Sequence, residues 1–439
     1  MPLKTEVFSF IIKTFGCQMN QADAERFSAF LVERGGILSN KNQSDLIVFV
    51  SCGVRQTAEQ KAISLIKKIK QDQPETHLIL TGCLAHRPDV RKTLNDIVDI
   101  FIPAGRLGDF QHEIEKIIQK KGKAFENFYS LKPLREEPFR AFIPIMTGCN
   151  NFCAYCVVPF ARGREISRSP ENIIGETKEA IENGGKEIFL LGQNVNSYKG
   201  LDRNGQKWDF PDLIRRINDL KGDFWIKFIS SHPKDVTSKL ISAMRDCQKV
   251  SSNLHLPIQA GSDKILSLMN RKYTVERYLK IIAMAKKIHP EIVISSDIIV
   301  GFPGETLKDF EQSKKIIEKV RFEMLYSLKY SKRPETAAGR LKETVDALEK
   351  KRRQQELDQL WKKISVQNNQ KFLGKKIKFI VNSIKEKGDG LIILGKSFEE
   401  KTICAIEKKI DNKISKGDWA WARIESVGPL SLTGRIVKK

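Results

Sequence analysis

The chain has 439 residues, of which 41% are hydrophobic and 29% are charged, and its formal net charge is +23. This length suits about three domains, and because no run of 18 apolar residues occurs we expect no membrane-spanning helix. The N-terminus lacks a small-residue cleavage site, so we expect no signal peptide and a cytoplasmic protein. The positive charge fits a polyanionic partner such as nucleic acid, but it fits lysine-rich solvated helices equally well.

The first section, about residues 1–135, alternates short apolar runs with helical patterns, which is typical of parallel βα units. Three of the runs end in a cysteine: Cys17, Cys52 and Cys83. Because the carboxyl ends of parallel strands line one crevice in an open sheet, we expect these cysteines to converge. A single cysteine at a strand end would be interpreted as core filling, whereas three at equivalent places predict a ligand set.

The second section, about residues 140–340, contains six strand candidates separated by helical patterns: 141–149, 187–195, 224–232, 253–261, 292–301 and 322–331. Six βα units fall short of the eight of a full barrel, so we predict an α/β fold with an open partial barrel. Its reactive face is expected at the carboxyl ends of the strands. Polar residues gather at these ends: Cys149, Gln193, Asn194, His232, Gln259, Gly301, Tyr330 and Arg333.

A charged amphipathic helix is predicted over residues 341–372. Its apolar positions recur with helical spacing and are Leu357, Leu360, Trp361 and Ile364. We expect this helix to brace the barrel, so that the second domain with its trailing helix covers about residues 140–370.

The last section, residues 373–439, has four strand-like runs separated by turns, which is typical of a small β-barrel. Lys and Arg outnumber Asp and Glu in it. Binding of RNA is the functional interpretation of this charge, and a solvated surface on an accessory domain is the alternative. Trp225, Trp419 and Trp421 are interpreted as packing residues, although an exposed Trp419 or Trp421 could stack on a base.

The chain has eight cysteines, which in a cytosolic protein favour metal binding or catalysis over structural disulfides. Cys247 and Cys404 have no cysteine nearby and are interpreted as structural. Cys149, Cys153 and Cys156 have the spacing C-x3-C-x2-C, and no fourth Cys or His follows closely, as structural zinc would need. An iron–sulfur cluster accepts thiolates from one short loop, and three of them leave one iron without a protein ligand.

Residues 148–159, GCNNFCAYCVVP, resemble the cluster loop of the radical S-adenosylmethionine (SAM) superfamily. Residues 298–306, IIVGFPGET, resemble its strand-end segment near the adenosyl group. The resemblance implies a [4Fe-4S] cluster whose open iron binds SAM and whose electron releases a 5′-deoxyadenosyl radical. It also implies a set of cofactor contacts: Gln193, Asn194, Gly301, Pro303, Gly304 and Glu305.

With three more cysteines in an N-terminal domain and a C-terminal β-barrel similar to a TRAM domain, the whole chain resembles the methylthiotransferases. This resemblance implies a second [4Fe-4S] cluster on Cys17, Cys52 and Cys83, whose open iron carries the sulfur to be transferred. One SAM would methylate that sulfur and another would supply the radical. We expect the anticodon stem-loop of tRNA as a partner, an electron donor such as flavodoxin or ferredoxin, and a monomeric enzyme.

Three segments are similar to the methylthiotransferases that act on N6-isopentenyladenosine in tRNA: residues 14–25, 190–198 and 267–274. In the last of these, other branches tend to carry Arg in place of Asn270. A basic C-terminal domain would also repel the basic substrate of the ribosomal-protein branch. We therefore expect methylthio transfer to C2 of the adenosine at position 37, where an unpaired purine can be splayed out of the loop.

Two alternatives remain open. One is a methylthiotransferase for threonylcarbamoyl-adenosine, and the other is a redox-sensing RNA-binding protein whose clusters do not turn over. Some positions depart from the family pattern: Val50 and Ser51 beside the second cysteine, residues 332–340, and Lys396. His232 resembles a family turn residue, for which a structural role and a contact to SAM are both possible interpretations.

Overall fold

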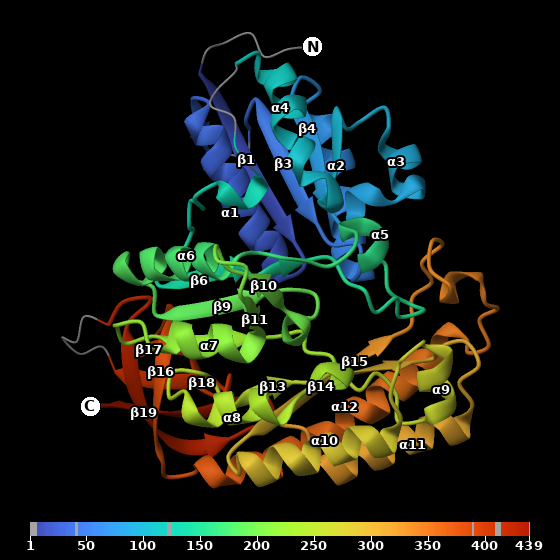
Figure 1. Ribbon diagram of the computed structural model, residues 1–439, viewed down its shortest axis with the longest axis vertical. Helices are drawn as coiled ribbons and strands as arrows, with labels where there is room; N and C mark the ends of the chain where they lie inside the picture. The colour runs from blue at the N-terminus through green and yellow to red at the C-terminus, as the bar shows by residue number, and fades with distance from the viewer. Residues whose placement is uncertain are drawn as a thin grey trace.

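The computed structural model describes residues 7–39, 43–120, 125, 127–388, 390–408 and 414–438. The chain forms an N-terminal sheet domain, a central open barrel and a C-terminal closed barrel (Figure 1). This architecture confirms the predicted fold class. Within the described ranges, no helix is long and apolar enough to cross a membrane.

The N-terminal domain is built on a parallel sheet of order β2-β1-β3-β4-β5. Its strands are β1 (Phe8–Phe15), β2 (Gly36–Leu38), β3 (Leu46–Ser51), β4 (His77–Gly82) and β5 (Ile100–Pro103). Every residue of β3 and β4 is buried, as expected for the centre of a parallel sheet covered on both faces. The short strands β2 and β5 were not predicted.

Helices cover both faces of this sheet (Figure 1). Helices α1 (Gln18–Glu33) and α4 (Phe110–Ile118) pack on one face through a cluster rich in phenylalanine. Helices α2 (Gln56–Asp72) and α3 (Pro88–Leu94) pack on the other face through aliphatic residues. The two layers leave the carboxyl edge of the sheet accessible to the rest of the chain.

The central domain has all six predicted strands. They are β6 (Arg140–Pro144), β9 (Glu187–Leu191), β12 (Trp225–Phe228), β13 (Asn253–His255), β14 (Val293–Val300) and β15 (Met324–Lys329). They form two parallel three-stranded sheets, which meet where Ile226 N donates to Lys249 O at 2.7 Å and Ser251 N donates to Ile226 O at 2.9 Å. The order β6-β9-β12-β13-β14-β15 therefore runs as one open barrel.

Helices between the strands cover the outside of this barrel and bury one large aliphatic core. They are α6 (Pro170–Glu182), α7 (Phe210–Asn218), α8 (Ser238–Asp246), α9 (Asp263–Leu268), α10 (Val275–Ile288) and α11 (Leu307–Val320). Two small strand pairs lie on loops of this domain. One joins β7 (Met146–Thr147) to β8 (Ile166–Ser167), and the other joins β10 (Lys199–Leu201) to β11 (Lys207–Asp209). The short helix α5 (Val158–Arg162) lies between β7 and β8.

The long helix α12 (Ala347–Asn369) begins later than the predicted residue 341. Its start is set by Asp346, whose side chain accepts a hydrogen bond from Glu349 N at 2.8 Å, a typical N-cap. Trp361 Nε1 donates to Phe322 O at 3.2 Å, so the helix braces the barrel as expected. Its core side holds the predicted residues Leu357, Leu360, Trp361 and Ile364.

The C-terminal domain is a closed barrel of order β16-β17-β18-β20-β19. Its strands are β16 (Lys376–Lys387), β17 (Gly390–Ser397), β18 (Thr402–Lys408), β19 (Trp419–Val427) and β20 (Ser431–Val437). The predicted β-barrel is confirmed, and β20 is an additional strand that the sequence pattern did not identify.

This small barrel docks on the amino-terminal ends of the central strands. Arg140, which pairs with the buried Glu187 at 2.6 Å, also donates to Asn382 Oδ1 of the small barrel at 2.9 Å. Trp225 packs on Trp419 with ring centroids 4.5 Å apart. Arg140, Glu187 and Trp225 each open a central strand, so the C-terminal barrel lies at the end of the strands opposite to the predicted reactive face. Trp225 and Trp419 are packing residues of this interface, as predicted.

Replacing Trp225 by alanine should loosen this interface. The side chain is buried, and truncating a buried tryptophan costs about 3–5 kcal/mol. We expect residues 373–439 to be released by limited proteolysis at a lower protease concentration than in the wild-type protein. Leu430→Ala, on an exposed turn of the same barrel, is the control; equal protection of both variants would contradict the prediction.

Candidate functional site

The N-terminal cysteines converge at the carboxyl edge of the sheet. Cys17 caps α1 just after β1, Cys52 follows β3 and Cys83 follows β4. These three strands are neighbours. Gly16 adopts φ +118°, and a Cβ atom there would lie 3.2 Å from Cys52 Sγ, so only glycine lets the first cysteine loop approach the second this closely.

Burial governs the protonation of this trio. It raises the pKa of the Cys52 and Cys83 thiols, and the neighbouring thiols, Cys17 for Cys52 and Cys52 for Cys83, raise it further. Val54 N donates a hydrogen bond to Cys52 Sγ at 3.3 Å, which favours a thiolate. Three clustered sulfurs that are costly to ionise alone fit a cationic iron centre, which binds cysteine as thiolate.

A buried arginine from the central domain lies beside these sulfurs. Arg162, at the end of α5, donates to Asp23 Oδ2 at 2.7 Å and to Asn20 Oδ1 at 3.2 Å, both on α1. Its charge lowers the pKa of Cys83, against the larger effect of burial. Arg162 Nη1 is buried and has no hydrogen-bond partner among the described residues, so a donor remains free for an anionic sulfur centre.

The second trio lies on the loop between β7 and α5. The β7–β8 hairpin closes the base of this loop, and Gly148 turns the chain with φ +77° just before Cys149. Asn151 Nδ2 donates to Cys149 Sγ at 3.6 Å and Arg271 Nη1 donates to Cys153 Sγ at 3.2 Å. Hydrogen bonds to the ligand sulfurs are a common means of stabilising and tuning a cluster.

The two trios lie within electrostatic reach of each other. Burial is the main cause that raises the pKa of Cys156, and the charge of Cys83 contributes to it. Helix α5, which follows Cys156, packs on the 3₁₀ turn Leu84–His86 that follows Cys83. The N-terminal domain therefore sits on the carboxyl face of the barrel, with its cysteine edge turned toward the cluster loop.

A second contact fixes this arrangement on the opposite side of the barrel. Arg333, after β15, binds Glu59 at 3.0 Å and donates to Val54 O at 3.0 Å. Ser331 Oγ donates to Gln56 at 3.2 Å. Arg333 is thus placed beside the loop of Cys52. Burial lowers the pKa of its guanidinium, and the carboxylate of Glu59 is the largest opposing effect.

The predicted cofactor residues lie at the ends of β9 and β14. Gln193 Oε1 and Asn194 Oδ1 are buried and lack a hydrogen-bond partner among the described residues, while Asn194 Nδ2 donates to Asp235 at 2.8 Å. Burying two acceptors in one turn without hydrogen-bond donors carries a desolvation penalty. They fit a ligand with hydroxyl or amino donors.

The turn after β14 is stabilised by one of its own side chains, Glu305. Gly301 and Gly304 adopt φ +71° and +88°, and Pro303 between them is buried. Glu305 accepts from Gly301 N at 2.6 Å and pairs with Arg353 of α12 at 2.6 Å. The structure thus gives Glu305 a bracing role in this turn.

His232 anchors the end of β12. Its Nδ1 accepts a hydrogen bond from Lys234 N at 3.2 Å, and burial lowers its pKa to about 2. The ring packs edge-on against Tyr273, with centroids 5.6 Å apart. A neutral imidazole used to cap a turn favours the structural interpretation. The other predicted polar residues, Gln259 and Tyr330, lie after β13 and β15 at the same face.

The positions that depart from the family pattern are buried or make hydrogen bonds within the protein. Val50 and Ser51 end β3 and are fully buried. Lys396 Nζ donates to Glu400 O at 3.2 Å and to Thr402 Oγ1 at 3.0 Å within the C-terminal barrel. In the segment 332–340, Ala338 N donates to Ala154 O of the cluster loop at 2.7 Å. That segment therefore supports the loop despite its altered sequence.

Among the described residues, neither cysteine trio has the geometry of a site for a single metal ion. Among the described side chains, no three His, Cys, Asp or Glu residues stand close enough to hold one metal ion. In an iron–sulfur cluster each thiolate binds a different iron, so the sulfurs are spaced more widely than around one ion. Cys247 and Cys404 lie apart from both trios, in the core beside α8 and in β18.

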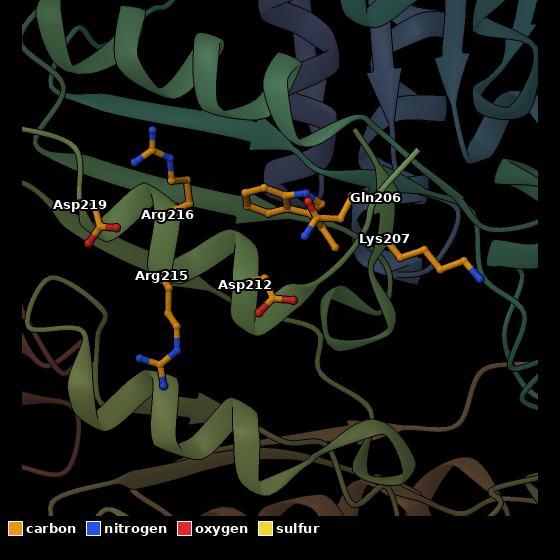
Figure 2. Close-up of a pocket in the computed structure, with 7 residues that line it drawn as sticks. Gln206, Lys207, Asp212, Arg215, Arg216 and Asp219 are labelled. Carbon is orange, nitrogen blue, oxygen red and sulfur yellow. The ribbon is translucent and has the colours of Figure 1, made fainter. Parts of the chain in front are cut away.

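A separate shallow pocket lies on the outer surface of the central domain, along α7 and the β10–β11 hairpin (Figure 2). It has a volume of about 320 Å³ and a mixed charged lining: Gln206, Lys207, Trp208, Asp212, Arg215, Arg216 and Asp219. It contains none of the predicted site residues, so it does not alter the placement of the candidate site.

Sequence reasoning missed three charged residues of the site: Asp23, Arg162 and Arg271. Asp23 lies six residues after Cys17, Arg162 lies six residues after Cys156, and Arg271 directly follows Asn270. Their proximity to the motifs was a signal that could have found them. Their pairing was not predictable, because the Asp23–Arg162 contact joins two separate domains.

Comparisons with known proteins match two segments and nearly the whole length of this chain. Residues 143–317 match the radical SAM superfamily, and residues 9–102 match the Uncharacterized protein family UPF0004. A tRNA-2-methylthio-N(6)-dimethylallyladenosine synthase of Acetivibrio thermocellus is 39% identical, over 98% of this chain and 91% of the relative. The protein of the same name from Clostridium botulinum strain Langeland is 37% identical, over 98% and 97% of the two chains.

Among solved structures, a radical S-adenosylmethionine methyltransferase, TsrM from Kitasatospora setae with tryptophan and a SAM analogue bound, is similar in fold. The match has a TM-score of 0.56 and 11% identity, and it covers 76% of this chain and 75% of that one. At this identity the likeness concerns the fold alone. It agrees with a partial barrel preceded by a parallel sheet domain.

Proposed function

This chain belongs to the family of the tRNA-2-methylthio-N(6)-dimethylallyladenosine synthases, and we propose that it adds a methylthio group to C2 of N6-isopentenyladenosine at position 37 of tRNA. The observation that carries the proposal is the packing of the two cysteine-bearing segments against each other. Helix α5, which follows Cys156, contacts the turn that follows Cys83, and Arg162 of α5 binds Asp23 of α1 at 2.7 Å. A radical source and a sulfur source must meet at one substrate carbon, and this arrangement brings their ligands together.

Each trio would hold one [4Fe-4S] cluster with an open iron. Cys149, Cys153 and Cys156 would hold the cluster that cleaves SAM, and Cys17, Cys52 and Cys83 would hold the cluster that carries the transferred sulfur. Bound there, the clusters supply a one-electron reductant for SAM and a sulfur atom for transfer. SAM serves both as methyl donor and as radical source.

The protein contributes orientation and charge. Arg271 and Asn151 donate hydrogen bonds to the sulfurs of the loop. Gln193 and Asn194 offer buried acceptors that fit the ribose hydroxyl or adenine amino donors of SAM. The backbone of Gly301, Pro303 and Gly304, stiffened by Glu305, would form the wall beside the adenosyl group.

We assign three functional units, at about residues 1–135, 140–370 and 373–439. The last is a basic TRAM-like barrel proposed to grip the anticodon stem-loop. Because it docks at the amino-terminal ends of the central strands, the RNA would extend along the central barrel to reach the cysteines. We further propose a monomer in the cytoplasm that is reduced by flavodoxin or ferredoxin.

Deletion of the gene tests the substrate. We expect 2-methylthio-N6-isopentenyladenosine to disappear from tRNA nucleosides analysed by mass spectrometry, with N6-isopentenyladenosine accumulating in its place. A plasmid copy of the gene should restore the methylthio product. Loss of the threonylcarbamoyl derivative instead would transfer the assignment to that branch.

Anaerobic turnover tests the reaction class. The reconstituted, reduced protein should cleave SAM to 5′-deoxyadenosine and methylthiolate a prenylated stem-loop RNA. Fully loaded protein that binds RNA but never cleaves SAM would identify a redox-sensing RNA-binding protein and refute the proposal.

A further inference from the structure

Three consecutive residues after α9 are bound to three consecutive residues of the cluster loop. Met269 O accepts a hydrogen bond from Ala154 N at 2.9 Å. Asn270 Nδ2 donates to Phe152 O at 2.8 Å, and Arg271 Nη1 donates to Cys153 Sγ at 3.2 Å. The segment 269–271 therefore fixes the loop residue by residue, and Asn270 is the position that the sequence singled out as typical of one substrate branch.

The residue fixed by Asn270 is an exposed aromatic ring. Phe152 is 37% exposed although it stands between two cluster cysteines, and it adopts φ +47°. A bulky residue with positive φ is a strained arrangement that persists where the surroundings impose it, often at functional sites. Asn270 itself has φ +56°, a conformation that asparagine tolerates well.

One face of this ring is covered by a cation. The Arg164 guanidinium carbon lies 4.4 Å from the Phe152 ring centroid, and Arg164 is exposed. Neither side chain is needed to close the core, because both face solvent beside the loop. An aromatic ring and a guanidinium plane are the two kinds of surface on which proteins stack unpaired RNA bases.

We propose that Phe152 and Arg164 form a stacking platform for an unpaired base adjoining the target adenosine. The hydrogen bond from Asn270 to Phe152 O fixes the position of the ring in this platform. The inference rests on the proposed function and names a part of its substrate site. The target base must come close to the cluster loop, so its neighbours in the RNA loop are expected near the exposed residues of that loop. Phe152 is the exposed ring on that loop, and the net charge of the chain, +23, favours a nucleic acid over a basic partner.

The test uses the holoprotein with both clusters and a prenylated anticodon stem-loop RNA. Two RNA versions carry 2-aminopurine on the 5′ or the 3′ side of the target. We expect Phe152→Ala to weaken binding roughly 5- to 100-fold, since stacking of one base contributes this range, and to abolish the quenching of one of the two probes. Phe152→Trp should keep both binding and quenching. Asn270→Gly, which keeps the backbone conformation but removes the amide, should weaken quenching.

Ile37→Ala, an exposed apolar truncation on the edge strand β2, is the matched control and should bind as the wild type does. Wild-type affinity and quenching in both Phe152→Ala and Asn270→Gly would overturn the platform, even if the RNA is methylthiolated normally. If Phe152→Ala slows only reduction by a flavodoxin, the ring belongs to an electron-donor surface and the proposal is wrong. If the Phe152→Ala protein does not bind its clusters, the affinity and quenching of the Asn270→Gly protein decide the test. Failure of the wild type to modify the RNA would instead count against the proposed function.

Discussion

Replacing Cys153 by alanine is expected to abolish the cleavage of SAM to 5′-deoxyadenosine. The variant should retain about four of about eight iron atoms per chain, because the loop would lose one of its three thiolates while the N-terminal trio stays intact. The hydrogen bond that Arg271 gives to Cys153 Sγ would also be lost, which leaves a buried guanidinium donor unpaired. Iron and sulfide analysis together with Mössbauer spectroscopy measures the loss.

Cys247→Ala is the matched control for this substitution. Cys247 is buried beside α8, apart from both trios, so the variant should keep its full iron content and its activity. A Cys153→Ala protein that still holds two clusters and cleaves SAM at the wild-type rate would contradict the assigned ligand set. The control separates loss of a ligand from the general effect of losing a thiol.

The periodicity of the sequence was enough to predict the long strands. Strands such as β3, β4 and β9 are buried, largely apolar runs, which a local pattern identifies. The missed strands β2 and β5 have only three and four residues; β13 is equally short, but it opens the longer run 253–261 that marked it. In β20 the alternation is interrupted by Gly434, where a side chain would collide with the backbone of Arg423; a close approach between strands explains that glycine, and it is visible only in the folded barrel.

The residues of the site also fall into those that a local sequence pattern predicts and those that only the folded structure reveals. The cysteines were predictable because their spacing and their places at strand ends are local properties. The charges that surround them were not, since Arg162 meets Asp23 across 139 positions and Arg271 meets Cys153 across 118. Glu305 is marked by the motif as a cofactor residue, which stays a prediction; its ion pair with Arg353 of α12 could not be predicted from the motif.

Replacing Arg162 by methionine is expected to destabilise the protein by about 3–5 kcal/mol, because Asp23 would remain buried without its partner. Both side chains of this pair are only 1% exposed. Chemical denaturation measures the effect. The double variant Arg162→Met, Asp23→Leu removes both charges and should recover most of the stability, since a buried ion pair can be replaced by apolar residues at little cost.

The single variant also tests electrostatics at the N-terminal trio. The Arg162 charge lies close enough to act on Cys83, and a nearby positive charge favours the reduced, more negative state of a cluster. Loss of this charge alone should therefore shift the midpoint potential of the auxiliary cluster to more negative values. In the double variant the shift should be much smaller, because the negative charge of Asp23, which acts on Cys17 and Cys83 in the opposite direction, is lost as well. Measured in the Cys153→Ala background, which should hold only that cluster, an unchanged potential in the Arg162→Met variant would mean that Arg162 acts only by holding the two domains together.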